Sequence, residues 1–136
     1  MIIEVYDIET LSNLFTYTGF DATNKQWHQF VISKWRNDVE LLYSHLFRDK
    51  LYHVGFNNES FDYPVIHHLI NHYKEYQNLN GEDLAQKLYK KSQDIIDQEF
   101  STIADKNKFI KQIDLFKMWH YSNPARSTSL KDLEIA

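Results

Sequence analysis

The chain has 136 residues and a formal net charge of −4 at pH 7, and 43% of its residues are hydrophobic. This length suits a single domain over residues 1–136, and the hydrophobic content excludes an intrinsically disordered chain. No cysteine occurs, which excludes a disulfide framework and a thiolate zinc site. We expect a cytoplasmic protein without a membrane segment, because the sequence has neither an apolar run of about 18 residues nor a basic, apolar leader. The acidic balance disfavours a sequence-specific DNA-binding module, but it is compatible with an enzyme that recruits its substrate partly through metal ions.

Hydrophobic periodicity predicts five strands and several helices. Two of the first three strands are joined by a short polar turn, which indicates an antiparallel hairpin or meander. In chain order, we expect strands at 2–9, 13–20 and 26–33, a helix from Asn37 to Leu46, a strand at 51–56, helices at 62–73 and 81–100, a strand at 110–116 and a further helix from Ser129. The predicted fold class is α/β: a mixed five-stranded sheet flanked by helices, with the fourth and fifth strands parallel to the first.

Three carboxylates follow the predicted strands. Asp7 and Glu9 close the first strand, and residues two apart on a strand point the same way, so both can reach one cation or a pair of cations. Ile3 and Val5 precede them on that face, so we expect the two acids to lie on the side that faces the core. Asp62 starts the helix after the fourth strand, where the helix dipole stabilises an anion. Oxygen ligands favour Mg²⁺ or Mn²⁺ over zinc. Each acid taken alone is better explained as a solvated strand end or a helix-start acid, and only the two motifs together favour a metal site.

Two short motifs resemble those of a known family. The first, Asp7-x-Glu9, ends the first predicted strand, and the second, Asn58-x-x-Phe61-Asp62, follows the fourth. Their order, spacing and strand contexts are similar to those of the DnaQ-like (DEDD) 3′–5′ exonucleases, especially the proofreading domains of family B DNA polymerases. The surrounding runs Tyr-Asp-Ile-Glu-Thr and Gly-Phe-Asn-Asn are also typical of this family. The resemblance covers nearly the whole chain and implies a ribonuclease-H-like fold.

The resemblance also implies a reaction, the two-metal hydrolysis of nucleic-acid 3′ ends to nucleoside 5′-monophosphates. Two Mg²⁺ or Mn²⁺ ions about 3.5–4 Å apart activate a water and stabilise the leaving 3′ oxygen in such sites. By this resemblance, Asp7 bridges both ions, Glu9 holds one and orients the water, and Asp62 contributes to the second.

The same resemblance implies the substrate contacts and the setting. Leu11, Asn58 and Phe61 are expected to line the terminal nucleotide, and aromatic stacking of unpaired bases is physically reasonable there. The implied partner is a single-stranded DNA 3′ end, with RNA as the second option. The implied process is proofreading, or phage DNA replication or repair in the host cytoplasm.

The family's third motif marks a departure. It is a Tyr or His a few residues before a last Asp, on a helix that follows the Ser-Leu-Lys segment, and the sequence ends at Ala136 before such a pair. Asp114 is expected on the fifth strand and Asp132 on the surface of the last helix, and neither has the required preceding residue. The sequence therefore predicts a carboxy-terminally truncated domain, whose partner would be the missing segment or an attached polymerase domain. A different class of function stays open, a catalytically inactive module that binds nucleic acid or a protein.

Two other polar groups have weaker functional interpretations. His68 and His72 are one helical turn apart, but a zinc protease pattern would need a Glu beside the first His. We interpret them as part of a solvated helix face. The lysines between Lys87 and Lys111 form a loose basic stretch that is either a solvated face or a contact for a phosphate backbone.

Overall fold

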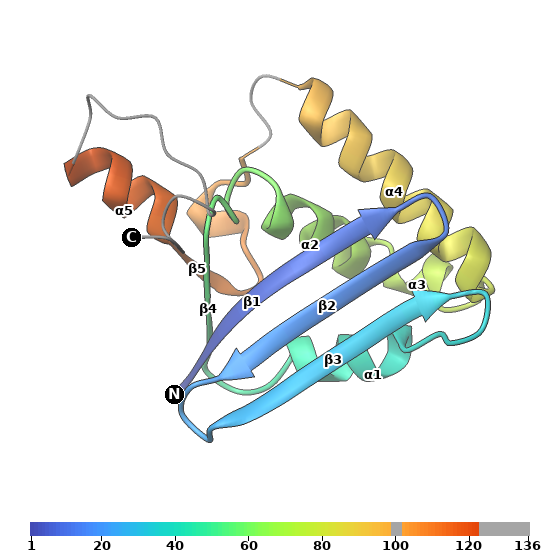
Figure 1. Ribbon diagram of the computed structural model, residues 1–136, viewed down its shortest axis with the longest axis horizontal. Helices are drawn as coiled ribbons and strands as arrows, with labels where there is room; N and C mark the ends of the chain where they lie inside the picture. The colour runs from blue at the N-terminus through green and yellow to red at the C-terminus, as the bar shows by residue number, and fades with distance from the viewer. Residues whose placement is uncertain (99–101, 123–136) are drawn as a thin grey trace.

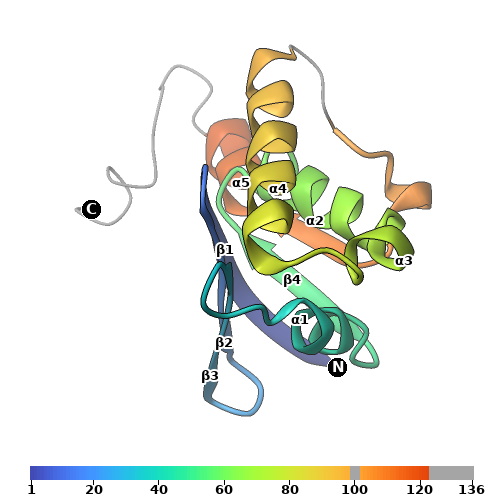
Figure 2. The same cartoon turned by 90° about the vertical axis from the view of Figure 1, so that its right-hand side faces the viewer.

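The computed structural model describes residues 1–98 and 102–122, which form a five-stranded sheet with helices packed on it (Figure 1). In chain order, the elements are β1 (Ile2–Leu11), β2 (Leu14–Asp21), β3 (Gln26–Ser33), α1 (Val39–Leu46), β4 (Leu51–Gly55), α2 (Asp62–Asn71), α3 (Tyr73–Tyr76), α4 (Gly81–Asp97), the short 3₁₀ helix η1 (Asp105–Asn107), β5 (Lys111–Asp114) and α5 (Leu115–Ser122). Figure 2 shows the sheet nearly edge on, with α1 to α4 on one side of it. We call the opposite side the outer face.

The strands are ordered β3-β2-β1-β4-β5 across the sheet. The first three form an antiparallel meander, whereas β4 pairs in parallel with β1, and β5 pairs in parallel with β4. These pairings confirm the predicted α/β class and the mixed five-stranded sheet flanked by helices. The last register pair of β1 and β4 is Val5 with Val54, and β4 ends one residue later, so the loop after β4 lies beside the middle of β1.

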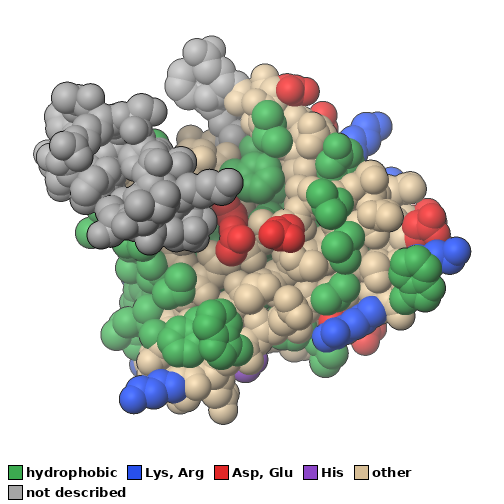
Figure 3. Space-filling model, in the orientation of Figure 1, with side chains coloured by type: hydrophobic (Ala, Val, Ile, Leu, Met, Phe, Trp, Pro, Cys, Tyr) green, Lys and Arg blue, Asp and Glu red, His purple; other side chains and the backbone are tan. Residues whose placement is uncertain are grey.

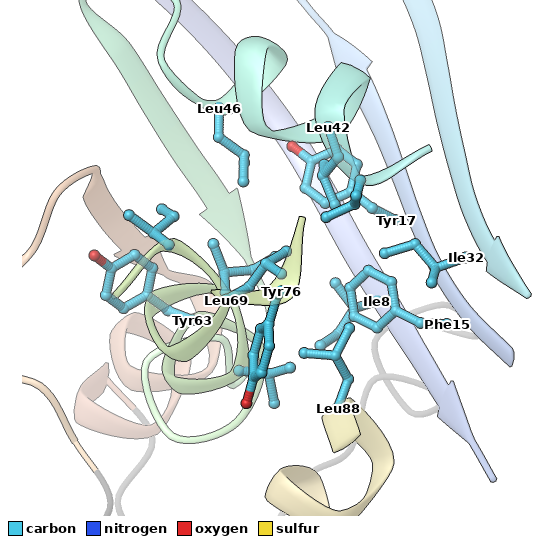
Figure 4. Close-up of a cluster of buried hydrophobic side chains, with 14 of the residues drawn as sticks. Ile8, Phe15, Tyr17, Ile32, Leu42, Leu46, Tyr63, Leu69, Tyr76 and Leu88 are labelled. Atoms are coloured by element: carbon cyan, nitrogen blue, oxygen red, sulfur yellow. The ribbon is translucent and has the colours of Figure 1, made fainter. Parts of the chain in front are cut away.

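The core lies between the sheet and the helices (Figure 4). The sheet contributes the buried side chains of Ile8 and Tyr17, and the helices contribute Leu42, Leu69 and Leu88. In α4 the buried residues recur every three or four positions, which is the spacing that places apolar side chains on one face of a helix. The helical periodicity of the sequence therefore identified the faces that pack on the sheet.

The predicted strand at 110–116 is shorter in the structure, and its end is a correction. β5 stops at Asp114, and α5 begins at Leu115. The side chain of Asp114 accepts a hydrogen bond from the Phe116 N–H at 3.0 Å, as a residue that caps the first turn of a helix does. The local capping interaction therefore overrides the apolar pattern of this segment.

Two predicted helices also differ at their ends. The helix expected at 62–73 is α2 followed by the separate short helix α3, with His72 between them. The long helix α4 ends at Asp97, whereas its predicted end at Phe100 and the helix predicted from Ser129 lie outside the described residues. Within the part of the chain that is described, none of the helices has the length and hydropathy to cross a bilayer.

Candidate carboxylate site

The strand β1 places the predicted acids on the outer face. Tyr6 and Ile8 point toward the helices and are buried, whereas Val5 is 45% exposed and Asp7 and Glu9 are exposed. The expectation that these acids lie on the core-facing side is therefore wrong. The helices cover the face of β1 that carries the even-numbered residues, whereas Asp7 and Glu9 lie on the opposite, outer face. Figure 3 views the outer face, where acidic side chains lie close together near the middle.

Asp62 reaches from the start of α2 to the middle of β1 and meets Asp7. It is 6% exposed, and its Oδ2 accepts a hydrogen bond from the Ile8 N–H at 3.1 Å. Burial raises the pKa of Asp62 to about 7; the Ile8 N–H opposes this rise, and the charge and hydrogen bond of Asp7 add to it. Two carboxylates in contact cannot both ionise without a penalty, and a divalent cation bound by both would remove that penalty.

Glu9 is less closely associated with this pair. It is exposed on the same face of β1, two residues beyond Asp7, as the strand periodicity predicts. In the part of the chain that is described, one group of three side chains has its ligand atoms within 4.8 Å of one another, and it lies on the helix-covered face of the sheet. The carboxylates of Asp7, Glu9 and Asp62 do not form such a group. The structure therefore brings Asp7 and Asp62 together and leaves Glu9 beside them in solvent.

The loop that leads to Asp62 is held by Asp114 and two lysines. The carboxylate of Asp114, 4% exposed, accepts hydrogen bonds from the Asn57 N–H at 2.8 Å and the Glu59 N–H at 3.1 Å. Asn57 has a left-handed backbone with φ of 60°, a conformation that a non-glycine residue adopts at some cost. The Glu59 carboxylate pairs with Lys108 at 2.5 Å and Lys117 at 2.6 Å. Asp114 lies on β5 as predicted, but its oxygens hold this loop, a role that the sequence did not reveal.

The three residues expected to contact a terminal nucleotide lie in different environments. Asn58 is fully buried, and its Nδ2 donates to the Gln112 Oε1 at 2.7 Å. The Tyr6 hydroxyl donates to the same oxygen at 2.7 Å. The Gln112 side chain, on β5, therefore connects the loop at Asn58 to β1. Phe61 is half-buried against the core, and Leu11 is 52% exposed at the end of β1. Phe61 and Leu11 therefore keep surface available for a ligand, whereas Asn58 anchors the loop.

A groove of about 440 Å³ opens beside Asp7 on the outer face. Its walls include Val5, Phe20, Trp27 and Phe56, so it is largely apolar apart from the carboxylate at one side. A concave apolar surface with a few polar groups at its edge is the usual form of a ligand site.

A second polar cluster lies on the helix-covered side of the sheet. Glu4, His28 and His45 offer ligand atoms that all lie within 4.8 Å of one another. The Arg48 Nη2 donates to the Glu4 Oε1 at 2.7 Å and lies 2.8 Å from the His45 Nε2, and the Tyr17 hydroxyl donates to the other oxygen of Glu4. Burial alone would raise the pKa of Glu4, but hydrogen bonds from His45, Tyr17 and Arg48 lower it to about 2. The guanidinium already neutralises this carboxylate, so the cluster is better explained as a buried ion pair than as a metal centre.

Of the two histidines at 68 and 72, His68 in α2 is the one that is partly buried. The His68 Nε2 lies 2.7 Å from the Tyr76 hydroxyl, and burial lowers the pKa of this half-buried imidazole to about 4. His72 is exposed. The predicted solvated face is therefore confirmed for His72 and wrong for His68.

Comparison with known proteins finds no matching family model, curated protein or solved structure. The carboxylate pair, its supporting loop and the neighbouring groove are therefore the basis for a functional proposal.

Proposed function

We propose that this chain is a metal-dependent 3′–5′ exonuclease domain of the DnaQ-like (DEDD) type, with a ribonuclease-H-like fold. The observation that carries the proposal is the contact between Asp7 and the buried carboxyl of Asp62 at the edge of a groove. Burial raises the pKa of Asp62 to about 7, and the charge of Asp7 adds to this rise. The meander of three antiparallel strands followed by two parallel strands supports the fold assignment. The resemblance of the two sequence motifs supports the reaction class.

The donor set suits Mg²⁺ or Mn²⁺. Both predicted ligands in contact offer carboxylate oxygens, which these ions prefer. Bound ions would lower the pKa of the attacking water and stabilise the leaving 3′ oxygen. Asp7 faces the solvent side of the pair, while the Ile8 N–H orients one oxygen of Asp62. Glu9 presents its carboxylate on the same face, where it would orient the water.

In the proposed reaction, the oxygen of a water molecule bonds to the terminal phosphorus as the bond from phosphorus to the 3′ oxygen breaks. The 3′ oxygen takes up a proton, so the products are a nucleoside 5′-monophosphate and a strand with a new 3′ hydroxyl. Phe61 and Leu11 would contact the terminal nucleotide. The proposed substrate is a single-stranded DNA 3′ end, with RNA as the second option. The proposed setting is proofreading, or phage replication or repair.

The test is the release of mononucleotides from 3′-labelled single-stranded DNA in the presence of Mn²⁺. Wild-type protein is expected to release label, and Asp7→Asn is expected to lose this release because the pair loses one negative ligand. Asp49→Asn is a matched control, since Asp49 is an exposed acid in the loop before β4, which lies beside the start of β1. Equal release by all three proteins, or none by a folded wild-type protein, would contradict the proposal.

A non-catalytic nucleic-acid-binding module is the second candidate. Two observations favour it: Glu9 is exposed and, among the described residues, forms no compact ligand group with Asp7 and Asp62, and backbone N–H groups already occupy the oxygens of Asp114. Such a module would bind single-stranded DNA without metal and leave it intact. Measuring binding in EDTA and release in Mn²⁺ on the same preparation separates the two candidates.

A further inference from the structure

A row of apolar side chains crosses the outer face of the sheet next to the carboxylate pair. Strand register aligns Val5 with Phe20 and Val54, Phe20 with Trp27, and Val54 with Ile113. Side chains of paired residues on neighbouring strands point to the same face, so these five residues form one continuous row.

This row is accessible. Trp27 is 73% exposed, Val5 is 45% exposed and Ile113 is 40% exposed. The Phe20 and Trp27 rings lie 4.9 Å apart between centroids, at an interplanar angle of 43°. A contiguous exposed apolar surface with two aromatic rings is characteristic of a binding site.

The row and the carboxylate pair share a groove. Asp7 forms one side of this groove, and Val5, Phe20 and Trp27 form part of the rest. Asp7 is two residues beyond Val5 on β1, so the acid and the apolar row are separated by about 7 Å along the strand. A ligand with a phosphate at Asp7 would therefore place its next flat, apolar group over the row.

Positive charge lies on the other side of the row. Lys111 lies with its Nζ 5.4 Å from the centroid of the Tyr52 ring, and the Tyr52–Lys111 pair lies two residues before Val54 and Ile113. Lys25, also exposed, is in the turn before Trp27. The order along the outer face is thus carboxylates, aromatic and aliphatic groups, then lysines. This order is complementary to a strand in which bases alternate with phosphates.

We propose that Phe20 and Trp27 form a stacking platform for the bases of a single-stranded nucleic acid whose 3′ end lies at Asp7. The inference rests on the proposed function and assigns its substrate contacts. Stacking requires the face of a base to be free, which favours an unpaired strand over a duplex. A second copy of the chain, or another protein, is the competing occupant of this surface.

The first test measures the fluorescence anisotropy of a labelled oligothymidylate in EDTA, where hydrolysis cannot interfere. Trp27→Ala is expected to weaken binding at least about fivefold, in line with the loss of one stacked base, and Trp27→Phe to weaken it less. Trp35→Ala is the matched control, because Trp35 is 87% exposed and lies beyond the other end of β3. It is expected to bind like the wild-type protein. Circular dichroism melts show whether each variant keeps its fold.

An abasic oligonucleotide tests the stacking itself. The wild-type protein should bind it more weakly, and Trp27→Ala should cause no further loss. Unchanged affinity of Trp27→Ala for oligothymidylate, or an equal loss in Trp35→Ala, would overturn the inference. The inference would also be overturned if sedimentation showed that the wild-type protein is a dimer and that Trp27→Ala dissociates it without changing the DNA affinity.

The binding and release assays fail independently. Binding that depends on Trp27 without mononucleotide release supports the platform and contradicts the exonuclease. If the wild-type protein and Trp27→Ala release mononucleotides at the same rate at subsaturating DNA, the exonuclease is supported and the stacking platform is overturned.

Discussion

Replacement of Asp62 by asparagine is expected to stabilise the metal-free protein at pH 8. Asp62 is 6% exposed, and its carboxylate accepts the Ile8 N–H at 3.1 Å. An asparagine oxygen can accept the same hydrogen bond. The substitution therefore removes a buried charge that faces Asp7 and keeps the hydrogen bond that orients the side chain.

The magnitude follows from the pKa of this carboxyl. Burial, with the added effect of Asp7, raises the pKa of Asp62 from 3.8 to about 7. The folded chain then holds the proton more tightly than the unfolded chain, so this stabilisation is complete below the unfolded pKa and is lost as the pH rises toward 7. The full loss corresponds to about 4 kcal/mol. Because Asp7 shares the titration, we expect Asp62→Asn to gain about 2–4 kcal/mol at pH 8.

Urea unfolding in EDTA measures this gain. The difference between Asp62→Asn and wild type should be small at pH 4, increase until about pH 7 and then stay constant. Excess Mn²⁺ at pH 8 should raise the melting temperature of the wild-type protein more than that of the variant, because a ligand that binds only the folded state stabilises it. A gain of the same size at pH 4 and pH 8, or no gain at all, would refute the reasoning.

Three further perturbations test other parts of the structure. Gly81→Ala should lower the free energy of unfolding in urea, because the Cβ of an alanine there would lie 1.9 Å from the Ser33 carbonyl oxygen. A gain of about 1 kcal/mol, as is usual when alanine replaces glycine in a helix, would contradict this expectation. Asp114→Asn should destabilise the fold by about 2 kcal/mol, because one amide oxygen cannot replace both carboxylate oxygens and either the Asn57 N–H or the Glu59 N–H loses its partner. An unchanged urea midpoint would argue against this role of Asp114. Glu4→Gln should reduce the loss of stability between pH 4.5 and 2. The pKa of the wild-type Glu4 carboxyl is lowered to about 2, so its carboxylate stabilises the fold above pH 4.5 and loses this effect as it protonates. Parallel pH profiles of the two proteins would contradict this assignment.

Periodicity in the sequence predicted most elements but assigned the wrong face of β1 to the core. The strand predicted at 26–33 coincides with β3, and the β-branched and aromatic residues that indicate it are local information. In β1 the even-numbered face contains Glu4, so the other face, which starts with Ile3 and Val5, looked more apolar. The structure buries Glu4 because Arg48, 44 residues later, pairs with it. A local pattern cannot register a partner at that distance.

The candidate site likewise contains one contact that could be predicted from the sequence and one that could not. The proximity of Asp7 and Asp62 could be predicted, because Asp7 lies in the second half of the first strand, Asp62 follows the fourth, and these two strands were expected to be parallel neighbours. The clamp by Asp114 could not, since its partners are backbone N–H groups of a left-handed turn at Asn57. Every residue except proline offers such a group, so no residue type in the sequence marks the contact.

Two buried carboxyls, Glu4 on β1 and Asp62 at the start of α2, have pKa values that move in opposite directions. Burial acts to raise both, but Glu4 has Arg48 at 2.7 Å and its pKa falls to about 2, whereas Asp62 faces Asp7 and its pKa rises to about 7. The counter-charge of Glu4 is the Arg48 guanidinium, which lies within the fold. The contacts described for Asp62 are an N–H group and a second carboxyl, which favour a proton or an added cation. A divalent cation can neutralise both acids at a pH where a proton is no longer held. The pair should therefore bind Mn²⁺ more tightly at pH 8 than at pH 6, and the Glu4 cluster should contribute nothing to that increase.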